Sequence, residues 1–311
     1  MTRVLLLGSA GQLGVELVES LAPDFELTAL TRAEADLTSE PALRAAIRAA
    51  EPAIVINAAA YTAVDRAESE PSLARAVNSA APRIVAQEAL RANAWLLHFS
   101  TDYVFDGSGD APWKETDPTR PLNVYGKSKL EGEKAIAAAG CRHLIFRTSW
   151  VYASHGNNFL RTMLRLGQQR PSLNIVDDQV GAPTSTNELA RAIRAVLHRL
   201  EDSTQRTQPG IYHMTCAGAT TWFRFASAIF AGMAGLVAAP ELNPISTRQY
   251  PTPAARPHNS RLNCQKLDHA MGIHLANWED ALAEVIQELH DAAAAAAAEA
   301  PITPVEQKPA S

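Results

Sequence analysis

A glycine-rich turn directly after the first apolar segment constrains the fold more than any other feature. Val4 to Leu7 is a short apolar run, typical of a strand buried on both faces. Gly8, Gly11 and Gly14 follow, and an apolar helical pattern continues to Leu21. A strand, a glycine turn and a helix in this order let the backbone approach a pyrophosphate at a helix N-terminus. We therefore predict a dinucleotide site here; the alternative is a tight turn without a ligand.

Strands and helices alternate from this turn to about residue 150. We expect strands at 25–30, 53–57, 95–100 and 143–147, and helices at 40–50, from 65 or 69 to about 93, and within 122–139. Such alternation produces a parallel sheet covered by helices on both faces. The sequence thus predicts an α/β fold with a doubly wound parallel sheet of the Rossmann type over residues 1–150.

The pattern loosens after residue 150. We expect helices at 158–169, 187–200, 221–233 and 278–290, short strands at 174–176 and 210–214, and an irregular proline-rich stretch at 240–257. We assign 151–290 to a smaller, mixed C-terminal substrate-binding part, some segments of which return to the first domain. Residues 291–311 are an alanine-rich extension, able to lengthen the last helix, followed by a disordered tail.

Composition and charge narrow the class of protein. The formal net charge of −5 gives no reason to expect a nucleic-acid or acidic-membrane partner. No apolar run approaches the roughly 20 residues that a membrane helix needs. The three cysteines are widely separated and lack metal-site spacing, which is typical of reduced thiols in a cytoplasmic protein. We therefore expect a small-molecule partner.

The end of the second expected strand bears on the type of dinucleotide. A site that prefers NAD usually places an acid here to hold the ribose hydroxyls, but the segment is Ala29-Leu30-Thr31-Arg32. Arg32 could meet a 2′-phosphate, which favours NADPH or the use of both NADPH and NADH. Alternatively, Arg32 is a solvated loop cation. Asp36 and Leu37 lie where the next loop could contact the adenine.

Tyr125 and Lys129 stand four residues apart, on one face of the helix expected within 122–139. An ammonium one turn away favours phenolate and lowers the phenol pKa from roughly 10, so the phenol becomes a usable proton donor and acceptor. The preceding strand ends at Ser100 and Thr101, whose hydroxyls face the same crevice, although these residue types also favour an ordinary turn. This grouping predicts a nicotinamide-dependent reductase acting on a carbonyl or hydroxyl.

Seven segments together resemble the extended short-chain dehydrogenase/reductase superfamily and, more narrowly, the dTDP-4-dehydrorhamnose reductase family. They are residues 8–14, 57–68, 100–105, 123–129, 147–152, 178–184 and 256–260. The resemblance covers nearly all of the chain to about residue 290. It implies NAD(P)H-dependent reduction of the 4-keto group of the nucleotide sugar dTDP-4-dehydro-L-rhamnose, the last step of dTDP-L-rhamnose synthesis. We also expect a homodimer.

The resemblance implies roles for single residues. Tyr125 would donate the proton, Lys129 would hold the nicotinamide ribose and lower the pKa of Tyr125, and Thr101 would support the substrate oxygen. The nucleotide sugar would contact Thr101, Asp102, Tyr103 and Trp150. The cofactor would be lined by Gly8, Gly11, Gln12, Leu13, Gly14, Thr31, Arg32, Asp36, Leu37, Ala60, Tyr61, Thr62, Tyr125 and Lys129.

A metal site is also implied, because some family members bind magnesium between subunits through glutamates. Glu16, Glu188 and Glu288 occupy the matching places, although each equally fits a solvated helix position. We therefore expect Mg²⁺ as a second, weaker prediction.

Two other functions stay open. A nucleotide-sugar epimerase or dehydratase of the same superfamily would share the fold, but an epimerase consumes no net NADPH. A dehydratase would carry a glutamate beside Asp102, and none is present. A non-catalytic nucleotide-binding regulatory subunit would not need the intact set of Thr101, Tyr125 and Lys129.

Overall fold

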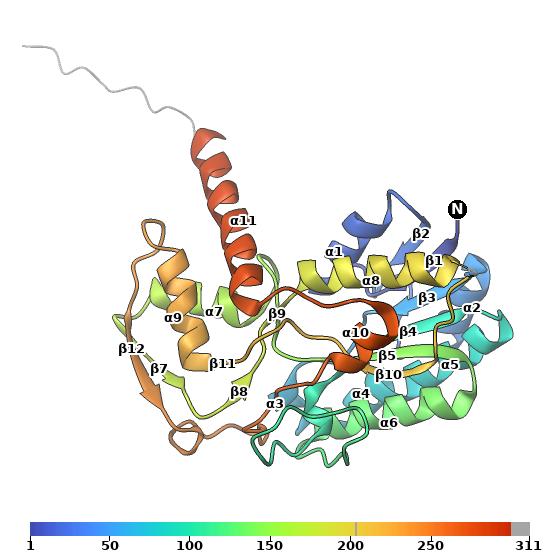
Figure 1. The fold of residues 1–311 in the computed structure, drawn as a ribbon, viewed down its shortest axis with the longest axis horizontal. Helices are drawn as coiled ribbons and strands as arrows, with labels where there is room; N and C mark the ends of the chain where they lie inside the picture. The colour runs from blue at the N-terminus through green and yellow to red at the C-terminus, as the bar shows by residue number, and fades with distance from the viewer. Residues whose placement is uncertain (203, 300–311) are drawn as a thin grey trace, which may run out of the picture.

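A six-stranded parallel sheet organises the chain (Figure 1). The computed structural model describes residues 1–202 and 204–299. In spatial order the strands are β2 (Glu26–Leu30), β1 (Arg3–Leu7), β3 (Ile54–Asn57), β4 (Trp95–Thr101), β5 (Arg142–Thr148) and β10 (Gly210–His213). The order reverses between β1 and β3, and ligands of such sheets bind beyond the carboxyl ends of the strands at this point. The predicted fold class is confirmed.

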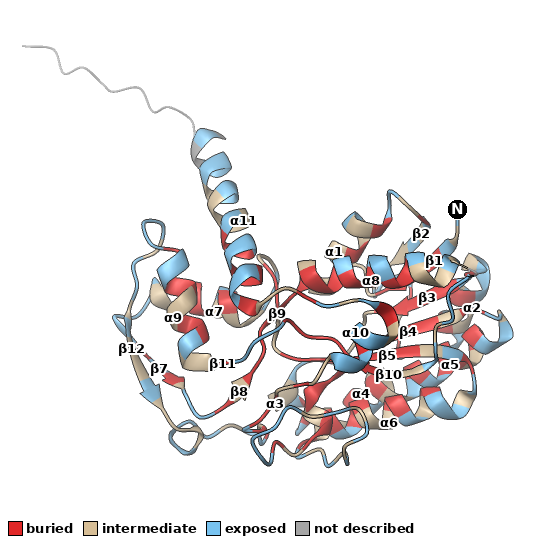
Figure 2. Ribbon diagram, viewed as in Figure 1, coloured by how far each residue is buried: buried red, intermediate tan, exposed pale blue. Residues whose placement is uncertain are grey.

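Alternate strand residues point to opposite faces of the sheet, and helices cover both (Figure 2). In β1, Val4 and Leu6 join one buried cluster, whereas Leu5 and Leu7 join another, as a period of two requires. The first face is covered by α1 (Gln12–Leu21) and α8 (Thr186–Glu201), and the second by α2 (Glu40–Ala50), α5 (Ala81–Arg91) and α6 (Val124–Ala139).

The helix expected from residue 65 or 69 to about 93 is confirmed from Pro71 to Arg91, which form one unbroken helical run. The segment contains α3 (Val64–Ala67), α4 (Pro71–Arg75), a π-helical turn η1 (Ala76–Ala80) and α5. Pro82 lacks an N–H group, so it cannot bond to the carbonyl of Asn78, and the helical ladder is interrupted there. The buried Asn78 side chain instead bonds to Tyr61 O at 3.0 Å and to Ser128 Oγ at 3.1 Å.

The C-terminal part builds three two-stranded sheets beside the main one. Their strands pair as β6 (Val151–Tyr152) with β9 (Thr184–Ser185), β8 (Val180–Gly181) with β11 (Thr220–Thr221), and β7 (Ser172–Val176) with β12 (Glu241–Ile245). Strand β12 lies within the stretch expected to be irregular, so that expectation is wrong for these residues. Its Pro244 is tolerated because a two-stranded sheet has only edge strands.

The remaining helices belong mainly to this part, and some contact the first domain. They are η2 (Asp102–Val104), α7 (Phe159–Gly167), α9 (Trp222–Gly232), η3 (Thr247–Gln249), α10 (Gln265–Met271) and α11 (Trp278–Glu299). Helix α11 runs through the alanines and projects from the body of the protein (Figure 1). The tail expected to be disordered lies largely in residues 300–311, outside the described residues. No helix in the described ranges is both long and apolar enough to cross a membrane.

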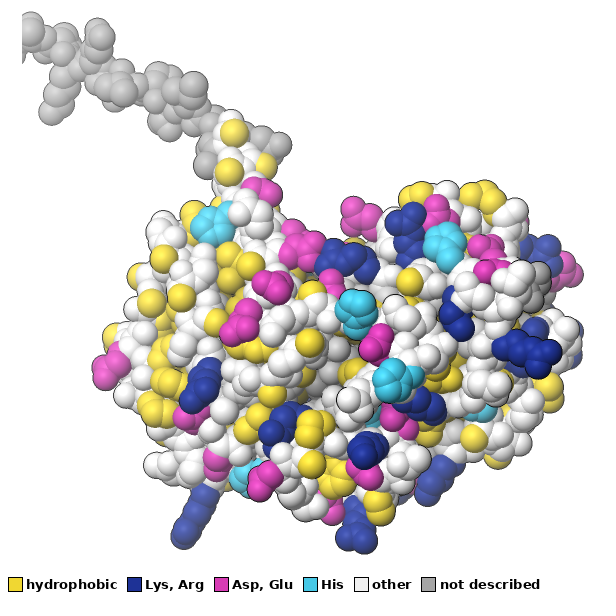
Figure 3. All heavy atoms as spheres, viewed as in Figure 1, with side chains coloured by type: hydrophobic (Ala, Val, Ile, Leu, Met, Phe, Trp, Pro, Cys, Tyr) yellow, Lys and Arg dark blue, Asp and Glu magenta, His cyan; other side chains and the backbone are white. Residues whose placement is uncertain are grey.

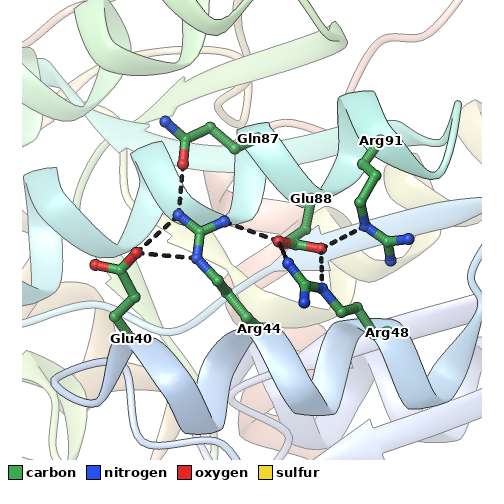
Figure 4. A network of polar contacts seen from close by, with 6 residues as sticks. All are labelled: Glu40, Arg44, Arg48, Gln87, Glu88 and Arg91. Carbon is green, nitrogen blue, oxygen red and sulfur yellow. Dashed lines mark hydrogen bonds and ion pairs between the residues drawn. The ribbon is translucent and has the colours of Figure 1, made fainter.

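An ionic network joins α2 to α5 (Figure 4). The Glu88 side chain is 2% exposed and receives hydrogen bonds of 2.7–2.8 Å from Arg44, Arg48 and Arg91. These bonds lower the pKa of Glu88 to about 2, and the bond from Arg48 contributes most to this shift. Elsewhere, acidic and basic side chains are interspersed over the face shown in Figure 3.

Candidate active site

The carboxyl end of β4 and the start of α6 converge, as the sequence predicts. The Lys129 ammonium is buried and donates to Phe99 O at 2.6 Å, which attaches α6 to β4. The N-cap of α6 is Asn123, whose Oδ1 accepts from Gly126 N at 2.8 Å. Its Nδ2 donates to Ala255 O at 2.7 Å, so the same residue fixes the start of α6 and a C-terminal loop.

Burial controls the titration of Tyr125. It raises the pKa of Tyr125 to about 12, with Asp102 adding to the rise and a hydrogen bond with Thr101 opposing it. The expected lowering of this pKa by Lys129 is therefore wrong for the protein alone, because the ammonium is directed to Phe99 O. The phenol stays protonated at neutral pH, which is the form that a proton donor requires.

Lys129 belongs to a row of three buried polar side chains, with His98 and Asn57, that was not predicted from the sequence. Its Nζ lies 3.5 Å from His98 Nε2, and His98 Nδ1 lies 3.2 Å from Asn57 Nδ2. Asn57 Oδ1 accepts from Ala59 N at 3.2 Å, which turns the NH₂ of the same amide group towards His98. Burial, and then the charge of Lys129, holds the pKa of His98 well below its usual value. His98 is therefore neutral.

Burial also lowers the pKa of Lys129 to about 8, opposed by the carboxylate of Glu133. Glu133 lies one turn further along α6 and pairs with the buried Arg147 through bonds of 2.9 and 2.7 Å. It also accepts a 2.5 Å hydrogen bond from the Ser100 hydroxyl. This second buried group, also missed, fixes the end of β4 against α6 and β5.

The four residues expected to contact the sugar, Thr101 at the end of β4 among them, share one edge of the sheet. Asp102 and Tyr103 follow β4 directly, and burial raises the pKa of Asp102 to about 7. The Tyr103 ring packs edge-to-face on Tyr125, with centroids 5.6 Å apart. Trp150 lies two residues beyond Thr148, the register partner of Thr101, and stacks on Trp222 at a centroid distance of 3.5 Å.

The glycine turn fits a pyrophosphate. A Cβ atom at Gly14 would lie 2.0 Å from Gly8 O, so only glycine permits this turn. Gly11 is the N-cap of α1 and supplies no side-chain cap, which leaves the first N–H groups of the helix available to an anion. The Gln12 side chain instead accepts a 2.7 Å hydrogen bond from Asn158, while Leu13 packs against the core.

The other expected cofactor residues lie around the switch point. Tyr61 N donates to Asn78 Oδ1 at 2.9 Å, which holds the loop from Ala60 to Thr62 after β3. Asp36 caps the turn at Thr38 through hydrogen bonds of 2.9 Å, and Leu37 is buried in the core. The side chain of Leu37 therefore serves packing, and Arg32 is exposed.

The three glutamates expected to bind magnesium do not form a site within one chain. Across residues 1–202 and 204–299 no group of three or more His, Cys, Asp or Glu side chains could hold a metal ion. Glu188 is paired with Arg191 and accepts from Ala276 N at 2.6 Å, and Glu288 accepts from Asn187. Burial raises the pKa of Glu16, and the charge of Glu288 adds to this rise. Magnesium shared between subunits stays a prediction.

A dinucleotide cradle at the switch point, with a tyrosine and a lysine one helical turn apart beside it, is the architecture of the extended short-chain dehydrogenase/reductases. The chain is of that class. Comparisons with known proteins narrow it further. A sequence model described as the RmlD substrate binding domain matches residues 1–291. The dTDP-4-dehydrorhamnose reductase of Salmonella typhimurium is 46% identical over 297 residues, covering 92% of this chain and 97% of that protein.

Solved structures agree. A dTDP-4-dehydrorhamnose reductase from Bacillus anthracis, in complex with NADP, has a TM-score of 0.86 and 33% identity. The enzyme from Clostridium acetobutylicum has a TM-score of 0.85 and 36% identity; each comparison covers 92% of this chain and 99% of the other. The chain belongs to the dTDP-4-dehydrorhamnose reductase family, and the family predicted from the sequence is confirmed.

Proposed function

We propose that this protein uses NADPH or NADH to reduce the 4-keto group of dTDP-4-dehydro-L-rhamnose, giving dTDP-L-rhamnose. Membership of the reductase family supports this substrate. The observation that carries the chemistry is the convergence of α6 with the carboxyl end of β4, which brings Tyr125, with Lys129 one helical turn further on, to the strand end that carries Thr101. Reduction of a carbonyl needs a proton donor at the oxygen, and Tyr125 supplies one.

Each residue of this group has a separate task in the proposed mechanism. A reduced nicotinamide, when bound, would supply a hydride to the carbonyl carbon. Tyr125 gives its phenolic proton to the carbonyl oxygen, while Thr101 donates a hydrogen bond that orients that oxygen. Lys129 would hold the nicotinamide ribose through its ammonium, which in the protein alone donates to Phe99 O. Asp102, Tyr103 and Trp150 bind the nucleotide sugar.

We also propose that the protein is a cytoplasmic homodimer. Its three cysteines are free and two of them, Cys141 and Cys216, are buried, which fits a reducing compartment. The dimer would place Glu16, Glu188 and Glu288 at a subunit boundary, where they could share Mg²⁺. Light scattering at several protein concentrations, with Mg²⁺ or with a chelator, tests the homodimer and the shared metal ion. A monomer under all conditions contradicts both.

The test of the activity is an assay with the keto-sugar and each reduced cofactor. We expect one NADPH or NADH to be oxidised for each molecule of dTDP-L-rhamnose formed, with the product identified by NMR. An epimerase would change the sugar without net oxidation of the cofactor. A regulatory subunit would bind nucleotide and oxidise no cofactor with this or any related keto-sugar. Either result would overturn the proposed function.

A further inference from the structure

A carboxylate lies at the end of β2, although the strand end itself contains no acid. Oε2 of Glu34 accepts hydrogen bonds from both Thr31 N and Thr31 Oγ1, each 2.8 Å long. The chain turns back between the two residues, because Glu34 N and Ala35 N both donate to Thr31 O. The glutamate therefore stands beside the first residue after β2. The sequence prediction considered only residues 29–32, which contain no acid, and did not include this glutamate.

This carboxylate is adjacent to the pyrophosphate cradle. Gly8 N and Ser9 N donate to Leu30 O at 2.9 and 3.1 Å, so the glycine turn is bonded directly to the end of β2. In dinucleotide sites of this fold, an acid at this strand end accepts hydrogen bonds from the hydroxyls of the adenosine ribose. Both contacts of Glu34 with Thr31 use Oε2, and within the described residues Oε1 makes no hydrogen bond. Oε1 is thus available to a ribose hydroxyl.

The charges around this position disfavour a 2′-phosphate. The hydrogen bonds from Thr31 lower the pKa of Glu34, so it is ionised at neutral pH. The pKa of Asp36 is lowered by hydrogen bonds from Thr38 and also by the charge of Arg32, which places this cation near Asp36. Glu34, Asp36 and Arg32 together carry one net negative charge. A phosphate monoester adds roughly two more at pH 7, which these carboxylates repel.

We propose that Glu34 holds the adenosine ribose and determines the cofactor preference of this enzyme, in favour of NADH over NADPH. The proposal rests on the dinucleotide site of the proposed function. It assigns to a residue three positions beyond the strand end the task that an acid at Thr31 would otherwise perform. A Thr-x-x-Glu pair can also act purely as a turn cap, so the experiment must separate the two roles.

The test is direct titration of the purified protein with NADH and with NADPH, followed by cofactor fluorescence without any sugar. Glu34→Gln removes the charge but keeps an acceptor for Thr31. We expect its Kd for NADPH to fall about tenfold and its Kd for NADH to rise a few-fold. Glu26→Gln is the matched control, since this exposed residue begins the same strand, roughly 13 Å from its other end. Its charge is screened from the site, so both Kd values should stay unchanged.

Competition by 2′,5′-ADP and by 5′-ADP repeats the measurement for the adenosine half alone. The ratio of their affinities should shift in the same direction, and melting curves should show that Glu34→Gln is folded. An unchanged ratio, within twofold, would assign Glu34 to the turn alone and overturn the inference, as would a shift towards NADH. Because the readout is binding, failure to reduce the keto-sugar leaves the inference measurable. Failure to bind either cofactor overturns both proposals.

Discussion

Burial has opposite consequences for the two residues that define the site. It keeps the phenol of Tyr125 protonated, with a pKa of about 12, and it makes the ammonium of Lys129 easier to deprotonate, with a pKa of about 8. The tyrosine is thereby kept in its acid form. The lysine is costly to bury, and the folded protein retains it through one hydrogen bond to Phe99 O and the nearby charge of Glu133.

Replacement of Lys129 by Met should stabilise the fold and weaken cofactor binding. Because the pKa of Lys129 is lowered from 10.5 to about 8, the unfolded chain binds more protons than the folded protein between these pH values. Lys129 therefore makes the free energy of unfolding rise with pH over this window, by up to about 3 kcal/mol. Urea unfolding at pH 7 and pH 10 should show a larger rise in the wild type than in Lys129→Met. Equal rises would contradict the assignment.

Sequence reasoning placed residues correctly where local spacing decides their position, while their catalytic roles stay predictions. Tyr125 and Lys129 share a helix face, and Thr101 ends a strand that an apolar run predicts. It did not single out His98 or Glu34, because their contacts with Lys129 and Thr31 depend on the folded chain. The predicted lowering of the Tyr125 pKa was wrong for the same reason, because helix spacing does not determine which group the ammonium of Lys129 contacts.

The glycine turn between β1 and α1 is the element that defines the cofactor site. Its backbone closes on itself, with Gly11 N donating to Gly8 O at 3.0 Å. Of the surrounding elements, the sequence predicted the strands and the turn well, since both have strong local signals. It did not predict the π-helical turn η1 between α4 and α5, where Pro82 has no N–H group to continue the regular α-helical hydrogen bonding.

Gly14→Ala should abolish tight cofactor binding. Its Cβ atom would lie 2.0 Å from Gly8 O, which forces the turn open, and strain of about 1–3 kcal/mol corresponds to a loss of roughly 5- to 150-fold in affinity. Titration with NADH measures the change. Gly140→Ala is the control, because it adds a methyl group to the glycine that ends α6, where a Cβ meets nothing within 4 Å and only the strain of a positive φ is introduced, away from the turn. Unchanged NADH affinity in Gly14→Ala would show that the turn does not bind the pyrophosphate.

The whole molecule is less divisible than its sequence indicates. Helix α8 and strand β10 come from the C-terminal half, yet α8 covers the main sheet and β10 is its sixth strand. The return of β10 to the main sheet depends on pairing between segments more than 60 residues apart, such as Leu144 with Gly210. No local sequence pattern encodes such a pairing. The division into a domain of residues 1–150 and a substrate-binding part of residues 151–290 stays a prediction.

Acid stability at the scale of the whole fold should depend on Glu88. The pKa of this carboxyl is lowered from 4.5 to about 2, so its contribution is complete above pH 4.5 and is lost as the pH falls towards 2. Two of its arginine partners are about half exposed, and solvent weakens their pairing. We therefore expect Glu88→Gln to lower the free energy of unfolding by about 2 kcal/mol at pH 7, and by much less at pH 3. A difference independent of pH would contradict this.

The central claim is that Tyr125 is the acid of a reductase site, and the rate of a single reductive turnover tests it most directly. Tyr125→Phe removes the phenolic oxygen and leaves the ring in place. Mixed with reduced cofactor and dTDP-4-dehydro-L-rhamnose, this variant should oxidise the cofactor roughly 100- to 10,000-fold more slowly than the wild type. Its Kd for the cofactor and its melting temperature should stay close to wild type. A folded Tyr125→Phe variant that turns over at the wild-type rate would contradict the account.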